Sequence, residues 1–215
     1  MALTVTHRTA DPATLDTPLL IVPVAKGVTS PALDALDSSV GGAIGRCRAS
    51  GDFTGAKDEL AVLYPPSGKV ARVILVGLGE VEKVTAASLR RAAMVAGKRA
   101  RVLGAPSAAL LFIAAMAPAV DAGKAGQSLA EGLPFGAWHY PDLKRPPETP
   151  KPKFESAEII TAVADAAFAA GVARGTAIAE GQTFTRYLQM LLATPARRRS
   201  SASRPRHWGS GMASP

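Results

Sequence analysis

The segment Arg72-Val-Ile-Leu-Val-Gly77 is the clearest candidate for a buried strand in this 215-residue chain. Its four consecutive apolar residues, three of them β-branched, are bounded by a charged residue and a glycine. This pattern is typical of a strand that is buried in a parallel sheet. Similar apolar runs occur before and after it, and we expect them to form the rest of one sheet.

Short apolar runs rich in β-branched residues predict the other strands. From residue 19 to residue 163, these runs alternate with segments of helical pattern. The alternation predicts an α/β fold, a three-layer sandwich with a mostly parallel sheet. The other expected strands cover residues 3–6 (an edge strand), 19–24, 60–64, 108–115 and 158–163.

Capping residues and apolar spacing predict the helices. Ser30 precedes Pro31, and Thr85 precedes an alanine-rich segment, as N-cap residues do. Glycines interrupt two of the patterns, at Gly41-Gly42 and at positions 171, 175 and 181, and glycine disfavours a helix interior. The expected helices cover residues 31–44, 86–100, 121–138 and 165–192.

The composition is that of an ordinary globular protein, with 47% hydrophobic and 20% charged residues. No run of about 18 apolar residues is free of charge or proline, so we expect no membrane span. The first residues lack an apolar stretch of signal-peptide length. A single cysteine, Cys47, excludes an internal disulfide and a cysteine zinc cluster. These features favour a cytoplasmic location.

The net charge of +8 is unevenly distributed along the chain. Residues 1–190 hold 20 basic and 17 acidic residues, whereas the segment from Leu191 onward contains five arginines and no acid. A basic tail binds phosphate backbones non-specifically. The nearly neutral body gives DNA binding little support beyond that tail, which we expect to be disordered.

Gly77 and Gly79, in Val76-Gly-Leu-Gly79, are the candidates for a phosphate-binding turn. Glycines after a strand let the backbone approach a phosphate at the next helix. The dinucleotide fingerprint needs a third glycine and an immediate helix, whereas here Glu80 and Glu82 intervene and would repel phosphate. A structural tight turn is the favoured interpretation.

The remaining polar candidates form no local catalytic or metal-binding motif. The histidines are far apart in the sequence, the acidic residues of one loop are expected to be solvated, and the serines lack a nucleophile elbow. We therefore predict no catalytic, cofactor-binding or metal-binding residue in this chain. The candidates considered are His7, His139, His207, Asp52, Asp58, Glu59, Ser67 and Ser88.

Several stretches, in order, resemble the N-terminal half of the cytosolic leucine aminopeptidases. Gly51-Asp-Phe-Thr-Gly55 is similar to the family's Gly-Asp-Phe-x-Gly loop. Residues 72–79 and Leu89-Arg-Arg-Ala-Ala93 resemble its central strand and the following helix. Glu131-Gly-Leu-Pro-Phe-Gly-Ala-Trp138 resembles a further motif, and Ala179-Glu-Gly-Gln182 resembles the helix that enters the catalytic domain. The resemblance covers residues 3–190.

The resemblance implies a macro-type α/β domain at residues 1–163 and a connecting helix at 164–192. The family's catalytic domain, which is similar to zinc peptidases, binds two divalent metal ions, zinc or manganese, through Lys, Asp and Glu. Members are typically homo-hexamers that release N-terminal amino acids from peptides. The metal-ligand motif Asn-Thr-Asp-Ala-Glu-Gly-Arg has no counterpart here. Peptide substrates would therefore be reached only through the absent catalytic domain.

The resemblance stops at Leu191, where the family usually continues with Pro-Gly-Asn-x-Cys-Thr-Pro. When the reading frame is shifted so that each new codon begins on the third base of the old one, permissible codons for Leu191 to Arg198 encode Pro-Gly-Asn-Thr-Cys-Thr-Pro. We therefore interpret residues 193–215 as a frameshifted or truncated end. The leading hypothesis is an N-terminal fragment of a leucyl aminopeptidase. The alternative is a stand-alone macro-type module that binds a nucleotide or ADP-ribose near Gly77 and Gly79.

Overall fold

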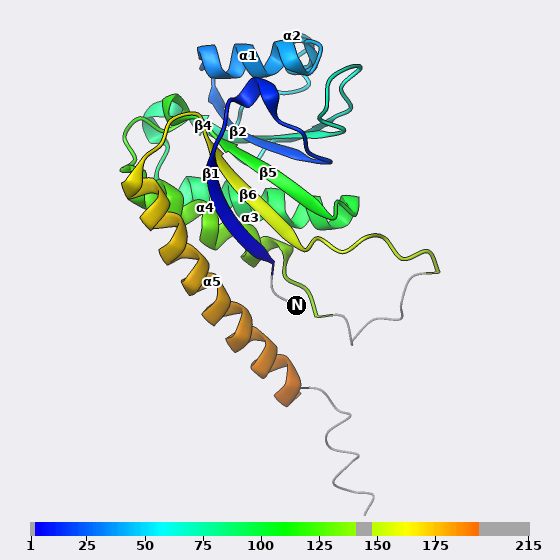
Figure 1. Cartoon of the computed structure of the whole chain (residues 1–215), viewed down its shortest axis with the longest axis vertical. Coiled ribbons are helices and arrows are strands. Elements are labelled where there is room, and N and C mark those ends of the chain that lie inside the picture. The colour runs from blue at the N-terminus through cyan, green and yellow to red at the C-terminus, as the bar shows by residue number, and fades with distance from the viewer. Residues whose placement is uncertain (1–2, 141–147, 194–215) are drawn as a thin grey trace, which may run out of the picture.

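The computed structural model describes residues 3–140 and 148–193. Six strands in this part of the chain form one sheet, and all neighbours pair in parallel except the last two, which are antiparallel (Figure 1). The mostly parallel sheet predicted from the sequence is thus confirmed. In spatial order the strands are β1 (Thr4–Thr9), β6 (Ser156–Thr161), β5 (Ser107–Phe112), β2 (Leu20–Lys26), β4 (Val73–Glu80) and β3 (Leu60–Leu63).

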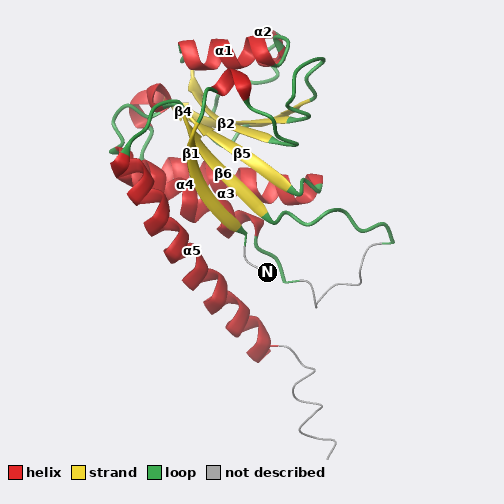
Figure 2. Cartoon of the chain, in the orientation of Figure 1, coloured by secondary structure: helices red, strands yellow, loops and turns green. Residues whose placement is uncertain are grey.

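Helices cover the sheet on both sides (Figure 2). Helices α1 (Pro31–Ser39) and α2 (Ala43–Ala49) lie over one face. Helices α3 (Ala86–Leu103) and α4 (Ala122–Ala137) and the first part of α5 (Ala166–Ala193) form a layer over the other, in which α4 contacts both α3 and α5. Short 3-10 turns occupy Pro12–Thr14, Val81–Lys83 and Ala114–Met116.

The predicted capping residues begin their helices as expected. The Ser30 hydroxyl accepts a hydrogen bond from the Leu33 amide, and Thr85 forms a reciprocal capping box with Ser88. The single helical pattern expected over residues 31–44 is wrong, because the structure has two helices there. Gly41 and Gly42 both have positive φ, of 66° and 73°, and this left-handed backbone ends α1 before α2 begins.

The hydrophobic core extends beyond residue 163, into the segment that the resemblance assigns to a connecting helix. Phe168 and Val172, on the first turns of α5, are almost fully buried in the same cluster as the strand residues. The Phe168 ring stacks on Phe112 of β5 with 5.1 Å between centroids. Burial of such an aromatic side chain stabilises the fold by about 1.5–3 kcal/mol, so α5 begins as part of the body.

Glycines allow α3, α4 and α5 to pack at very short range. A Cβ atom built on Gly171 would lie 2.0 Å from the carbonyl oxygen of Gly123, and one on Gly136 would lie 1.9 Å from that of Met94. These glycines therefore sit where two helix backbones touch, and the close packing outweighs their poor helix propensity of about 1 kcal/mol each. Gly181, farther along α5, has no atom within 4 Å of such a Cβ.

Within the described residues, no helix combines the length and apolar character that a membrane crossing requires.

Candidate functional site

The glycines of Val76-Gly-Leu-Gly79 lie inside strand β4 and not in a turn after it, which corrects the tight-turn interpretation. A Cβ atom on Gly77 would be 1.7 Å from the carbonyl oxygen of Ala56, because the loop of residues 51–59 crosses the strand at this point. Backbone hydrogen bonds join loop and strand, including Gly77 N–H to Glu59 O (2.8 Å) and Gly79 N–H to Gly55 O (2.9 Å). Close approach of another backbone, rather than of a ligand, accounts for Gly77.

The Glu59 carboxylate holds this loop in shape. Its Oε2 accepts hydrogen bonds from the amides of Thr54 (2.9 Å), Gly55 (2.8 Å) and Ala56 (2.9 Å), and from the Thr54 hydroxyl. Desolvation alone would raise the pKa of Glu59, but the bonds from Thr54, Ala56 and Gly55 outweigh it and lower that pKa. The chain's own carboxylate thus fills an anion-binding nest of backbone amides.

A shallow hollow of about 340 Å³ lies beside this loop, at the carboxyl ends of β2 and β4. The register of β2 and β4 shifts between Val24 and Ala25, which leaves Leu78 as a bulge residue at the rim. Lys83 pairs with Glu80, and this contact, helped by the charge of Lys26, lowers the pKa of Glu80. The lining residues are Lys26, Ala56, Lys57, Leu78, Gly79, Glu80, Lys83 and Ser88.

The acidic residues of the loop, which the sequence analysis expected to be solvated, have separate hydrogen-bond partners. Asp58 accepts a 2.6 Å hydrogen bond from Arg91 Nε of α3, and Glu59 is held in the nest. Asp52 accepts from the Ser50 hydroxyl. Across residues 3–140 and 148–193, no group of three or more His, Cys, Asp or Glu side chains is arranged to hold a metal ion.

The histidines and serines lie apart from one another. His7 Nε2 shares a 3.0 Å hydrogen bond with Thr161 Oγ1, and burial lowers the pKa of His7, an effect that Asp165 partly offsets. Burial also lowers the pKa of His139, with a contribution from Arg101. Ser88 belongs to the capping box, Ser67 is exposed in a turn, and His207 lies outside the described residues.

A buried carboxylate that the sequence analysis did not single out joins three helices. Glu131 of α4 is 5% exposed, receives a hydrogen bond from Gln127 (2.7 Å) and pairs with Arg90 of α3 (2.9 Å). Arg174 of α5 reaches the Gln127 side-chain oxygen at 3.5 Å. The sequence did contain a signal for Glu131, a charged residue within an otherwise apolar helix face. Such a residue requires partners when it is buried. Its role is to join the helix layer.

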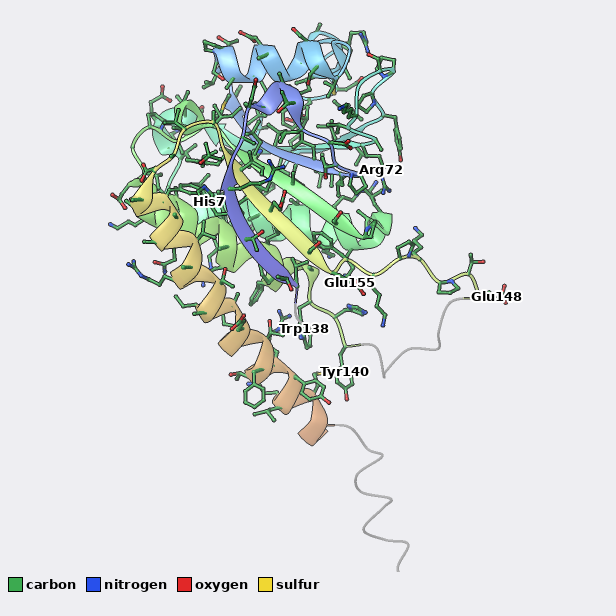
Figure 3. All side chains as sticks on the ribbon, viewed as in Figure 1. His7, Arg72, Trp138, Tyr140, Glu148 and Glu155 are labelled. Carbon is green, nitrogen blue, oxygen red and sulfur yellow. The ribbon has the colours of Figure 1, made fainter. Side chains whose placement is uncertain are left out.

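The last part of α5, residues 181–193, extends past the body of the domain, and we call it the arm (Figures 1 and 3). Phe184, Tyr187 and Leu188 on the arm are 63%, 46% and 42% exposed. On its other side, Arg186 stacks over the rings of Trp138 (4.0 Å) and Phe135 (4.3 Å). The arm thus presents adjacent apolar side chains to solvent.

The fold and these surfaces define a class of protein: an α/β domain with a mostly parallel sheet, a projecting last helix and no metal-ligand cluster among its described residues. The profile of the cytosol aminopeptidase family, N-terminal domain, matches residues 21–147. The chain therefore belongs to the cytosol aminopeptidase family, as its N-terminal domain, and the resemblance inferred from the sequence is confirmed.

Individual relatives agree with this assignment. A probable cytosol aminopeptidase of Alkalilimnicola ehrlichii is 30% identical over 86% of this chain, and one of Xylella fastidiosa is 31% identical over 91%. The chain spans 38% and 40% of the length of these two relatives.

Solved structures give the same fold. A mutant of tomato leucine aminopeptidase superposes with a TM-score of 0.64 at 21% identity, over 83% of this chain and 35% of the tomato chain. A macrodomain mutant from Oceanobacillus iheyensis gives 0.54 at 10% identity, over 81% of this chain and 92% of that one. At these identities the likeness concerns the fold, and the expected macro-like architecture is confirmed.

Proposed function

We propose that this chain is the non-catalytic domain of a metal-dependent leucyl aminopeptidase, a hydrolase that releases N-terminal amino acids from peptides. The observation that carries the proposal is the family match over residues 21–147, followed by a helix whose far end is apolar and exposed. Paired metal ions in such an enzyme activate water and polarise the peptide carbonyl. In the family those ions, zinc or manganese, are held by the catalytic domain.

The arm is the element through which this domain would meet its catalytic partner. We propose a division into an α/β domain (1–163), a connecting helix (164–192) and a basic tail (193–215), with the first half of the helix packed on the domain. Arg186, stacked on Trp138 and Phe135, fixes one side of the arm and leaves Phe184 and Leu188 facing outward. A cytoplasmic location and a homo-hexameric parent enzyme complete the proposal.

The alternative, a stand-alone module that binds a nucleotide or ADP-ribose near Gly77 and Gly79, has only the likeness of fold in its favour. The Ala56 carbonyl already lies against Gly77, and the Glu59 carboxylate takes the amides of the adjacent loop. DNA binding is likewise not supported by a particular surface of the described residues. The excess of basic over acidic residues that suggested it lies mainly in the segment from Leu191 onward, which has five arginines and no acid.

The first prediction concerns activity. We expect the purified chain to hydrolyse leucine p-nitroanilide no faster than buffer, with or without added Zn²⁺ or Mn²⁺. The reason is that the family's metal-ligand motif has no counterpart in the sequence. Release of p-nitroaniline, followed by absorbance, checks this. Metal-dependent turnover that co-purifies with the chain through two further chromatographic steps would contradict the proposal.

The second prediction concerns the arm. We expect the full chain to self-associate in sedimentation velocity, because burying each exposed apolar side chain contributes about 1.5–3 kcal/mol. A chain ending at Gly181 should be monomeric and retain its melting temperature, since the buried contacts of Phe168, Val172 and Ala179 remain.

A full-length double variant, Phe184→Ser with Leu188→Ser, controls for loss of the tail and should also be monomeric. Exposed Val102 on α3, changed to serine, should leave association unchanged. A monomeric full chain combined with an unfolded truncation would show that the arm is docked on the domain and would overturn this interpretation.

A further inference from the structure

The hollow at the carboxyl ends of β2 and β4 is separate from the arm and has the position of a ligand site. In open α/β sheets, small molecules bind outside the carboxyl ends of the strands, where loops and helix N-termini meet. Lys26 comes from the end of β2, Gly79 and Glu80 from the end of β4, and Ser88 from the first turn of α3. A volume of about 340 Å³ suits a ligand no larger than a sugar phosphate.

The charges around the hollow favour an anion. Three lysines, Lys26, Lys57 and Lys83, line it, and Glu80 is the only acidic side chain among its lining residues. Lys83 compensates Glu80 directly. Within the described part of the chain, Lys26 and Lys57 form no salt bridge, so two ammonium groups remain available.

The other nearby acids are engaged elsewhere. Asp58 pairs with Arg91, and Glu59 is held by the amides of Thr54, Gly55 and Ala56. Neither carboxylate lines the hollow. The repulsion expected from the sequence, where Glu80 and Glu82 follow the glycines, is therefore reduced for Glu80, whose charge Lys83 balances, while Glu82 is exposed and outside the lining.

The β4 residues Leu78 and Gly79 line the hollow. Leu78 is the bulge residue between the pairs Val24–Gly77 and Ala25–Gly79, and bulges are frequent beside binding sites. Gly79 has φ of 86° and no side chain, and a Cβ there would come within 3.4 Å of Lys57 Cβ. An added Cβ would thus be in ordinary contact with Lys57, and the positive φ is what favours glycine at position 79.

We propose that this hollow binds the phosphate group of a small phosphorylated metabolite, with Lys26 and Lys57 neutralising the phosphate charge. The remainder of the ligand lies over the β4 backbone at Leu78 and Gly79. The site goes beyond the role proposed for the domain in an aminopeptidase and does not depend on it.

Calorimetric titration of the full chain with ribose 5-phosphate tests the site, with inorganic phosphate and uncharged ribose as companion ligands. We expect saturable binding of ribose 5-phosphate, weaker binding of inorganic phosphate, and none of ribose. Equal affinity for ribose 5-phosphate and inorganic phosphate would support the anion site and would contradict a contact between the rest of the ligand and the backbone at Leu78 and Gly79. Absence of saturable heat with either phosphate, in dilute buffer, would overturn the proposal.

Substitutions locate the site. Lys57→Ala and Lys26→Ala should each weaken binding about three- to tenfold, as expected for loss of one partly exposed charge contact. Glu80→Gln should tighten binding, because it removes the carboxylate and frees Lys83. Lys98→Ala, an exposed lysine of α3 outside the hollow, is the matched control and should have no effect. Equal weakening by Lys98→Ala and Lys57→Ala would indicate general charge attraction and would overturn the assignment.

Discussion

Replacing Gly77 with alanine should destabilise the domain by about 3–5 kcal/mol, a large part of the stability of an ordinary domain. The new Cβ atom would fall 1.7 Å from the Ala56 carbonyl oxygen, so the crossing loop must retreat. Retreat breaks the bonds from Gly77 N–H to Glu59 O and from Asp58 N–H to Gly77 O, each worth about 1 kcal/mol. Urea denaturation followed by circular dichroism measures the change.

Gly79→Ala is the control for this substitution. An alanine at position 79 would be disfavoured by the backbone conformation but would not collide with another atom. The φ of 86° at Gly79 is unfavourable for alanine, but the nearest atom would be 3.4 Å away. We expect a loss of about 1–2 kcal/mol there. Gly77 itself does not have a positive φ, so if Gly77→Ala cost no more than Gly79→Ala, the collision with the crossing loop would lack its expected effect and the close contact described above would be wrong.

Two glycines of the same helix should respond in opposite ways to alanine. Gly171→Ala should destabilise the protein by about 2–4 kcal/mol, because its Cβ would lie 2.0 Å from the Gly123 carbonyl and would force α5 away from α4. Gly181→Ala meets no atom within 4 Å and should strengthen the helix by about 1 kcal/mol.

Melting temperature and helical ellipticity, measured on both variants, check the pair. Gly171→Ala should melt at a clearly lower temperature, whereas Gly181→Ala should melt no lower than the parent chain and show equal or greater helicity. Similar melting of the two variants would mean that α5 is not packed through Gly171, and the close helix contact described above would be wrong.

The apolar runs were sufficient to predict the sheet, because strands buried on both faces differ sharply from their surroundings. Residues 72–76, 108–112 and 158–161 all lie in strands or directly beside them. The edge strand β1 was expected only to residue 6, yet it continues to Thr9. His7 and Arg8 are polar residues of the edge strand, where hydrophobicity does not mark the strand.

Glycine was the residue whose role the sequence left ambiguous. Glycine at 77, 171 and 175 was interpreted as a turn signal or as a helix weakness, whereas each is a point of contact with another backbone. Such contacts join distant parts of the chain, so no local pattern reveals them. The same holds for Glu59 and Glu131, whose partners become apparent only when loop 51–59 and helices α3 and α4 are in place.

Because α5 is continuous, it fixes the rotation and the distance of any attached domain relative to the body of this one. The helix runs without a break from Ala166 to Ala193, and its first half is locked against α4. Each residue of an α-helix turns the chain by about 100° and advances it by about 1.5 Å. Deleting one residue from the arm would therefore swing an attached domain by more than a quarter of a turn about the helix axis. Length changes in this segment should be tolerated only in steps close to a whole helical turn.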